Sequence, residues 1–432
     1  MAADIGDPLQ RAELLAQRAS TVFQPRTPIT TKELFAGRWT ELTDISDAVH
    51  QPGLHVVIYG ERGVGKSSLA NVVSPTVWVM DGHRIEETPE EAAAIPERFM
   101  LKAVANSGDN FSTLWHRLLA DIQWPHPDDQ TLLVTTSTAF GLQGRVTVDE
   151  VRRVLANLRG AVFIVDEFDQ APRDVSKAFT ELIKTLSDLG VDCTIIIVGV
   201  SETVENLVGD HASIGRAVTQ IRLERMKADE LRQIIGKAES ALGIKFDDDA
   251  AALIVHVSQG LPHYVHLIGL HAVRSAAQRL SLTRVQLDDV FDALKKAVKQ
   301  AQQTVTEKHS TATHSSQKTA LYRQVLFACA LAAAQSHDSL GYFSPSAVVD
   351  PLTEILGKDI TIANFTSHLT GFCDPRRGAV LERDGQPWGY RYRFRDPLLV
   401  PFIFMDGMES GLTSGRGLLQ LLSRDQGFNL SS

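Results

Sequence analysis

The sequence predicts an α/β fold in which a parallel sheet with flanking helices is followed by an all-helical lid and a C-terminal winged-helix domain. From about residue 54, short apolar runs alternate with longer amphipathic stretches, as in a mostly parallel sheet. After residue 226 the strand-like runs stop, and apolar residues recur at helical spacing. Near the C-terminus, helical segments precede two strand-like runs around Asp384 and Gly385. This order is typical of a winged helix.

Length and composition indicate a globular protein with more than one domain. The 432 residues exceed what one hydrophobic core usually supports, and 44% of them are hydrophobic. The net charge of -9 argues against non-specific coating of nucleic acid, which needs many basic residues. The most apolar runs, at 194–200 and 326–334, are shorter than the roughly 18 to 20 residues that span a bilayer. With no secretory signal visible, we expect a cytoplasmic protein that has no membrane partner.

Five apolar runs predict the strands of the sheet. Their Val and Ile content indicates burial on both faces, as expected of central parallel strands. The runs lie at 54–60, 98–104, 160–167 and 193–200, with a weaker one at 219–226. An acidic stretch at 81–97 is interrupted by prolines, and we interpret it as a surface insertion.

A glycine-rich motif follows the first predicted strand. Residues 60–68, GERGVGKSS, fit the pattern G-x-x-x-x-G-K-[ST] and lead into an amphipathic segment. Glycines let the backbone wrap a phosphate and direct N–H groups toward it. In such a P-loop, Lys66 would reach the β- and γ-phosphates and Ser67 would offer its hydroxyl to Mg²⁺. The predicted nucleotide-binding residues of this loop are Gly60, Glu61, Arg62, Gly63, Val64, Gly65, Lys66, Ser67 and Ser68.

A second acidic motif follows the third apolar run, in AVFIVDEFD. Asp166 comes directly after the run, and we predict that it binds Mg²⁺ together with Ser67. Glu167 is the predicted acceptor of the proton from the attacking water. The alternative is that these acids cap the next helix, and both roles can coexist. Asp169 is interpreted as structural or as an auxiliary contact.

Two further residues are candidates for sensing the γ-phosphate. Ser201 follows the fourth run, where a polar side chain would lie beside that phosphate, although it could equally cap the next helix. Arg216 precedes the fifth run, where its cation could approach a phosphate of its own or of a neighbouring subunit's nucleotide. An exposed surface arginine is an equal alternative.

With these residues in place, the sequence resembles AAA+ ATPases of the initiator type, related to origin-recognition and replication-initiation ATPases, and the neighbouring STAND signal-transduction ATPases. The matching segments appear in the family's order over roughly residues 30 to 275. They are ELFAGR (33–38), GERGVGKSS, FIVDEFD, IIVGVSETVENLVGDHASIGR and SQGLPHYVHLIG (258–269).

The resemblance implies ATP or ADP as the nucleotide and Mg²⁺ as the metal. It implies that Phe35 to Arg38 lie near the adenine, that Arg216 is an arginine finger, and that Pro262 and His263 begin a lid helix facing the phosphates. His263 stands near the position where initiators carry a second-sensor arginine. Ser201 or Glu202 replaces the usual asparagine of the first sensor. These departures favour a slow switch over a fast motor.

The changes of pattern along the chain suggest six parts. Arranged around the P-loop core, they are an N-terminal helical extension at 1–28, the core at 29–226, a helical lid at 227–305, a linker at 306–318, the winged-helix domain at 319–410 and a flexible tail at 411–432.

The partner of the winged helix is left open by its charges. Residues 376–395 contain six arginines against Glu382 and Asp384, which would suit DNA. From residue 315 onward, however, eleven basic residues balance eleven acidic ones. Docking to a protein, or packing back on the core, is equally consistent with paired arginines on adjacent strands.

Three functional hypotheses follow. The first is an ATP-hydrolysing AAA+ switch that couples nucleotide state to a DNA or protein partner through its winged helix. The second is a STAND-like signalling or defence scaffold in which slow ATP turnover controls oligomerisation. The third is a homo-oligomeric ring on DNA, which requires Arg216 to act on a neighbouring subunit.

Overall fold

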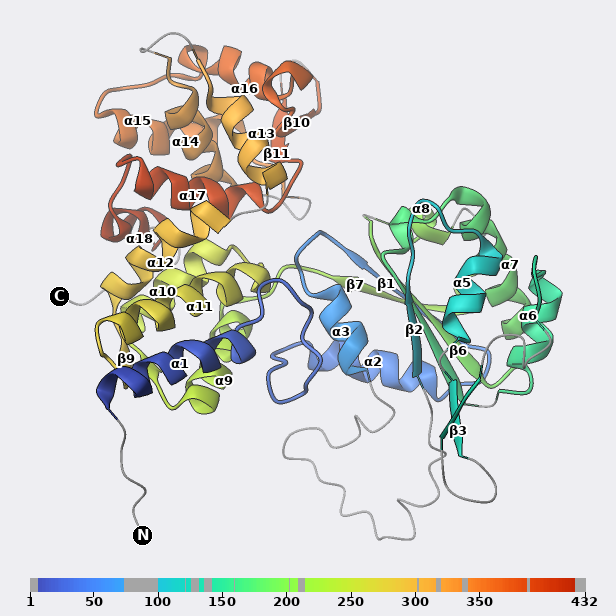
Figure 1. The fold of residues 1–432 in the computed structure, drawn as a ribbon. Coiled ribbons are helices and arrows are strands. Elements are labelled where there is room, and N and C mark those ends of the chain that lie inside the picture. Colours follow the sequence, from blue (N-terminus) through green and yellow to red (C-terminus); the bar gives the residue numbers. More distant parts are fainter. Residues whose placement is uncertain are drawn as a thin grey trace. The chain divides into compact units, whose positions relative to one another are not determined.

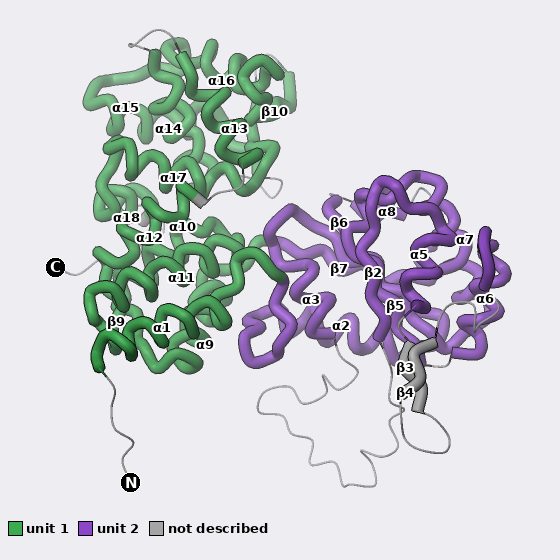
Figure 2. Tube along the Cα trace, viewed as in Figure 1, with its two compact units in different colours: residues 1–27, 225–432 green, residues 28–224 purple. Residues whose placement is uncertain are grey.

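A computed structural model gives the fold of the chain (Figure 1). It describes residues 7–73, 100–120, 122–125, 132–135, 142–158, 160–201, 203–208, 214–300, 303–315, 320–335, 341–386 and 389–423. The chain forms two units, one of residues 28–224 and one of residues 1–27 together with 225–432 (Figure 2). The predicted insertion at 81–97 lies outside the described residues.

The unit of residues 28–224 is built on a five-stranded sheet in the order β2-β5-β6-β1-β7, whose neighbouring strands are all parallel. The five predicted strands are therefore confirmed. They are β1 (His55–Gly60), β2 (Met100–Val104), β5 (Ala161–Asp166), β6 (Cys193–Val200) and β7 (Val218–Leu223). A separate antiparallel pair, β3 (Ile122–Pro125) and β4 (Leu132–Thr135), follows β2 in the chain.

Helices cover both faces of this sheet, as the apolar strands require (Figure 1). One face carries α2 (Trp39–Val49) and α3 (Lys66–Val72). The other carries α5 (Phe111–Leu118) and α7 (Arg173–Asp188), with α6 (Val148–Leu155) packed beside α7. The short α8 (Glu205–Val208) and the 3₁₀ turns η2 (Phe168–Gln170) and η3 (Ile214–Arg216) complete the unit.

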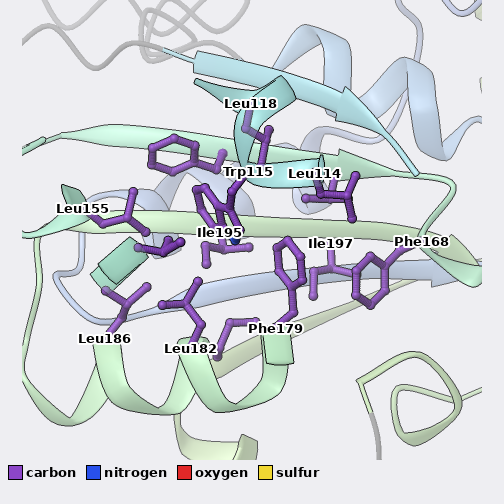
Figure 3. Packing of buried hydrophobic residues seen from close by; sticks show 14 of the residues in the cluster. Leu114, Trp115, Leu118, Leu155, Phe168, Phe179, Leu182, Leu186, Ile195 and Ile197 are labelled. Carbon is purple, nitrogen blue, oxygen red and sulfur yellow. The ribbon is translucent and has the colours of Figure 1, made fainter. Parts of the chain in front are cut away.

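Aromatic side chains fill the core between the sheet and α5 and α7 (Figure 3). Trp115 is fully buried and stacks on Phe179, with ring centroids 5.7 Å apart. It also contacts Phe163 of β5 edge-to-face, with ring centroids 5.2 Å apart. This packing fixes α5 and α7 against β5, so it also fixes the carboxyl end of that strand.

The second unit begins with helices that pack on α11 (Pro262–Gln278). Alternating spacings of three and four residues bury one face of α1 (Pro8–Val22). At its end, the ring of Phe23 fills the space over Gly269, where a Cβ atom would lie 2.5 Å from the ring. The remaining elements are α9 (Ala228–Leu242), α10 (Asp248–Ser258), α12 (Leu287–Gln300) and the short strands β8 (Lys245–Phe246) and β9 (Arg284–Val285).

Toward the C-terminus, three helices precede an antiparallel hairpin, in the predicted order. The helices are α14 (Tyr322–Gln335), α15 (Val349–Leu356) and α16 (Thr366–Phe372), with 3₁₀ turns η4 (Pro345–Val348), η5 (Ile362–Asn364) and η6 (Pro375–Arg377). The hairpin pairs β10 (Leu381–Asp384) with β11 (Arg391–Phe394). A long apolar helix, α17 (Leu399–Glu409), follows it.

Two predicted irregular segments are helical instead. The linker prediction at 306–318 is wrong over α13 (Gln303–Thr313), where Val305, His309 and Ala312 form a buried stripe at helical spacing. The tail prediction at 411–432 is wrong over α18 (Gly415–Ser423), because the leucines of LLQLL are buried. Residues 424–432 lie outside the described part of the chain.

No helix among the described residues is long and apolar enough to cross a bilayer. The three cysteines are free thiols, and two of them, Cys193 and Cys329, are buried.

Candidate active site

The glycine-rich loop joins the carboxyl end of β1 to the first residue of α3. Gly60 has φ 148°, and a Cβ atom there would lie 2.3 Å from the carbonyl oxygen of Leu223 in β7. Gly65 precedes α3 with φ 100°, a left-handed conformation that costs a residue with a side chain about 1 kcal/mol or more. Both ends of the loop therefore require glycine. The predicted strand, loop and helix of a P-loop are present.

Lys66 is folded back on this loop. Its side chain is buried, and its Nζ donates to the carbonyl oxygens of Gly60 at 3.1 Å and Glu61 at 2.7 Å. Burial lowers the pKa of Lys66 to about 8, although nearby carboxylates oppose the shift. The ammonium is thus held among dipoles inside the loop, where an anion would be a stronger partner.

Ser67 contacts Asp166 at the carboxyl ends of the strands. The Ser67 Oγ donates to the Asp166 Oδ1 at 3.1 Å, and the same oxygen accepts the Glu167 N–H at 2.9 Å. Asp166 ends β5 and is only 5% exposed. A hydroxyl and a carboxylate at this spacing are hard oxygen ligands, and they suit Mg²⁺ that is also bound by a phosphate. The two predicted metal ligands therefore lie together, and their chemistry fits that ion.

Two residues that the sequence analysis missed complete this cluster. Lys102 of β2 places its Nζ 2.8 Å from Asp166 Oδ2 and 2.7 Å from Asn71 Oδ1. Asn71 lies on α3, one turn beyond Ser67. The available signal was a lysine inside an otherwise apolar strand.

Glu167 and Asp169 follow Asp166 with different surroundings. Glu167 is exposed and has φ 53°, a strained conformation for a residue that is not glycine. Asp169 accepts the N–H of Val200 at 2.8 Å through its Oδ1. Asp169 therefore ties the turn after β5 to the end of β6, which agrees with its structural interpretation. The Glu167 side chain is accessible to solvent beside the metal ligands.

The Ser201 side chain forms its hydrogen bonds within the turn that follows β6. Its Oγ donates to the Thr203 carbonyl at 2.7 Å and accepts the Thr203 N–H at 3.3 Å. These bonds lie within the turn after β6 and do not reach α8, so both the sensor role and the helix-capping role of Ser201 stay predictions. Glu202 lies outside the described residues.

Arg216 lies near the amino-terminal ends of the strands, opposite to the ends that carry the P-loop. β7 begins at Val218, which pairs with His55 at the amino end of β1, whereas the P-loop follows Gly60 at the carboxyl end. At 3.3 Å per residue these two ends of β1 are about 16 Å apart. Arg216 lies two residues before the start of β7 and is exposed. This separation is longer than one arginine side chain, and the predicted role of Arg216 toward a phosphate of its own or of a neighbouring subunit's nucleotide stays a prediction.

Phe35 and Arg38 are buried in the segment before α2. Arg38 has φ 64° and precedes the helix, where its Nη1 donates to Glu41 at 3.0 Å and its Nη2 donates to the carbonyl oxygen of Glu224. These contacts join the start of α2 to the chain that leaves β7. The predicted proximity of both residues to an adenine stays a prediction.

Ser68 has a structural contact of its own. Its Oγ accepts the N–H of Ile29 at 3.0 Å, which fixes the chain before α2 to the P-loop helix. Ser67 and Ser68, adjacent in sequence, therefore have separate partners.

Pro262 and His263 begin α11 in the other unit. The His263 Nδ1 lies 2.8 Å from the carbonyl oxygen of Pro25, and its ring packs edge-to-face on Tyr264. Their contact with a nucleotide stays a prediction.

Comparisons with known proteins bear on the family and the fold of the chain. Residues 27–338, more than half of the chain, match the family model described as Novel STAND NTPase 1. No curated protein matches the chain.

Several solved structures are similar in fold. A Walker-type ATPase of Pyrococcus abyssi is 16% identical, with 89% of this chain and 99% of that chain covered and a TM-score of 0.50. The ORC2 protein of Aeropyrum pernix, in ADPNP and ADP complexes, is 13% identical over 90% and 98% of the two chains, with a TM-score of 0.48. The ORC1 protein of Aeropyrum pernix in complex with DNA is 15% identical over 93% and 97%, with a TM-score of 0.44.

The first of these structures supports the fold over most of the chain, while identities this low say nothing more. The family match rests on the sequence itself and includes the P-loop, Asp166 and Glu167. The chain therefore belongs to the Novel STAND NTPase 1 family.

Proposed function

We propose that this protein binds ATP with Mg²⁺ at the P-loop, hydrolyses the ATP slowly, and changes its interaction with a partner according to the nucleotide bound. The observation that carries the proposal is the 3.1 Å contact between Ser67 Oγ and Asp166 Oδ1, beside the buried Lys66. A hydroxyl on the phosphate loop and a carboxylate from a neighbouring strand converge there, as binding of a metal and a triphosphate requires.

Each residue has a separate task in this proposal. Lys66 would leave the two loop carbonyls for the β- and γ-phosphates, where its charge is compensated. Ser67 and Asp166 would hold Mg²⁺, which neutralises developing charge on the phosphates when it is bound. Glu167 would accept the proton of the attacking water, and its exposure keeps it accessible to that water.

Slow turnover is favoured by the two sensor positions. Ser201 is engaged by Thr203, and His263 is engaged by the Pro25 carbonyl. His263 does not offer the permanent positive charge that a second-sensor arginine would contribute to the transition state, and the Ser201 hydroxyl is shorter than the amide of a first-sensor asparagine. This observation favours a switch of the STAND kind over a motor.

The first route by which nucleotide state could reach the second unit is the chain from Phe23 to Ile29. Ile29 is bonded to Ser68 of the P-loop helix, while Pro25 accepts from His263 at the start of α11. Phe23 is held over Gly269 of the same helix. A shift of the P-loop helix would therefore move the connector of residues 23–29, whose first residues are bound to α11.

The second route is the chain that leaves β7. Leu223 contacts Gly60 of the P-loop so closely that only glycine fits. Three residues later, the Met226 N–H donates to the Gly260 carbonyl at 2.9 Å, just before α11. Both connectors thus have one end fixed beside the P-loop and one end fixed near the first turn of α11, and we infer that this turn receives the signal.

The partner that reads the signal is inferred to be a protein, with DNA as the second candidate. Three of the six arginines in 376–395 pair with acids, in Arg376–Asp374, Arg391–Asp384 and Arg393–Glu382. Arg377 donates to the carbonyls of Ala312 and His314 and lies over the Tyr322 ring. Most of the local positive charge is thus already neutralised or used within the domain, which favours a protein partner.

Steady-state ATPase assays with and without duplex DNA test the proposal. We expect slow turnover that Lys66→Ala abolishes and that DNA does not stimulate. DNA stimulation would favour the second candidate, and a gel shift that weakens steeply with salt would support it. Turnover that survives in Lys66→Ala would contradict the P-loop assignment itself.

A further inference from the structure

The role of Lys102 is not explained by phosphate binding or hydrolysis. It reaches from β2 to Asp166 with a 2.8 Å contact between Nζ and Oδ2. The Asp166 side chain is 7% exposed and the Lys102 side chain 29%. A carboxylate so deeply buried needs a compensating charge, and among the described residues Lys102 provides the ion pair.

The ammonium of Lys102 is held in a defined position. Its second partner is Asn71 Oδ1 at 2.7 Å, and the Asn71 Nδ2 in turn donates to the Ile29 carbonyl at 3.4 Å. Both the oxygen and the nitrogen of the Asn71 amide are therefore hydrogen-bonded. The Lys102 ammonium is held by α3, through Asn71, as well as by Asp166.

The two oxygens of Asp166 have different partners. Oδ1 accepts from Ser67 and from the Glu167 N–H, while Oδ2 faces Lys102. A divalent cation held by Ser67 and Asp166 would share one carboxylate with the Lys102 ammonium. Two cations on the same carboxylate repel each other, and partial burial reduces the screening of that repulsion.

We propose that Lys102 is a positioning residue that sets the Mg²⁺ affinity of this site. It keeps the Asp166 carboxylate oriented when no ion is bound, and its charge opposes the ion when it binds. The inference rests on the proposed function, because it concerns the same metal ligands.

The test measures binding rather than activity. Fluorescent ADP is titrated at a series of free Mg²⁺ concentrations, and the midpoint is the Mg²⁺ concentration that gives half of the gain in affinity. The variants are Lys102→Met and Lys102→Gln, which remove the charge, and Lys102→Arg, which keeps it. Lys184→Met, on the exposed side of α7, is the surface control.

We expect both neutral variants to lower the Mg²⁺ midpoint by roughly ten-fold or more, since ten-fold is the order expected for one charge about 6 Å from a divalent cation in water and partial burial weakens the screening. Lys102→Arg and Lys184→Met should stay near the parental midpoint. An unchanged or higher midpoint in both neutral variants would overturn the inference, as would loss of ADP binding by both in EDTA, which would make Lys102 merely structural. If the parental protein shows no Mg²⁺-dependent gain in ADP affinity, the proposed function fails, and this inference fails with it.

Discussion

At the scale of single residues, two adjacent serines have separate tasks. Ser67 contacts Asp166, whereas Ser68 contacts the backbone of Ile29. We predict that Ser67→Ala removes most of the Mg²⁺-dependent gain in nucleotide affinity, by about ten-fold, while leaving the fold intact. Ser68→Ala is the matched control. It should lower the free energy of unfolding by about 1 kcal/mol through the lost hydrogen bond and leave the Mg²⁺ dependence unchanged.

Fluorescent-nucleotide titrations with and without Mg²⁺, together with urea denaturation, separate the two effects. Equal loss of Mg²⁺ dependence in both variants would show that the 3.1 Å contact with Asp166 has no bearing on metal binding.

A buried histidine makes stability depend on pH. His55 lies at the start of β1, and its Nδ1 accepts the Ile195 N–H at 3.0 Å. Burial lowers the pKa of His55 to about 4, so between pH 6.5 and about 4 the unfolded chain binds the proton that the folded chain refuses. Stability is therefore lost as pH falls through this window. The expected loss is about 2 kcal/mol between pH 7 and pH 5 from this residue.

His55→Asn retains an acceptor in the same place but does not titrate. Guanidinium unfolding of both proteins at pH 7 and pH 5 should show a smaller decrease for the variant. Parallel decreases would mean that His55 makes no contribution.

The residues of the candidate site were predictable where they belong to one local motif. Lys66, Ser67, Asp166 and Glu167 follow directly from the sequence around them, and the sheet order brings the first three together. Lys102 was missed because its role depends on the register of β2 against β5, which pairs Lys102 with Ile164 and so places it near the end of that strand.

At the scale of elements, the docking of α1 on α11 depends on one aromatic ring. Phe23 is fully buried, contacts Phe246 and His266 edge-to-face, and fills the space over Gly269. We predict that Phe23→Ala lowers the free energy of unfolding of this unit by about 3 to 5 kcal/mol and releases the N-terminal helix.

Chemical denaturation combined with limited proteolysis measures both effects. Phe23→Leu, which keeps most of the buried volume, should show a much smaller loss. A Phe23→Ala protein that matches the parent in stability and in resistance to protease near residue 23 would contradict this account of α1.

The sheet strands could be predicted because they are continuous apolar runs, whereas their order in the sheet comes from the structure. The helices α13 and α18 could not. In α13 the buried stripe consists only of Val305, His309 and Ala312, so the surrounding polar residues hide it. Tertiary packing, rather than local apolar content, makes this segment helical.

At the scale of the whole molecule, Arg216 distinguishes a monomeric switch from an oligomer. It is exposed at the amino-terminal edge of the sheet, far from the P-loop of its own chain. If it acts on the nucleotide of a second copy, mixing Arg216→Ala with Lys66→Ala subunits should restore ATPase activity above the average of the two separate variants, because each supplies what the other lacks.

Activity that follows simple averaging at all mixing ratios would exclude this role for Arg216. The proposed slow switch would then work within one chain. Light scattering with ATP and with ADP shows whether oligomers are present in the mixture.

The division into two units was visible in the sequence as the end of the strand-like runs near residue 226. The grouping of residues 1–27 with the helical unit was not, because it depends on Phe23 fitting over a glycine nearly 250 positions later. Such a contact leaves no local pattern.

The most direct test of the central claim follows one turnover of bound nucleotide. Excess protein is mixed with radiolabelled ATP and Mg²⁺, and the bound ATP and ADP are separated over time. The parental protein should convert bound ATP to ADP, whereas Glu167→Gln should bind ATP equally well and retain it uncleaved. Conversion by Glu167→Gln at the parental rate would contradict the assigned base and, with it, the proposed chemistry of this site.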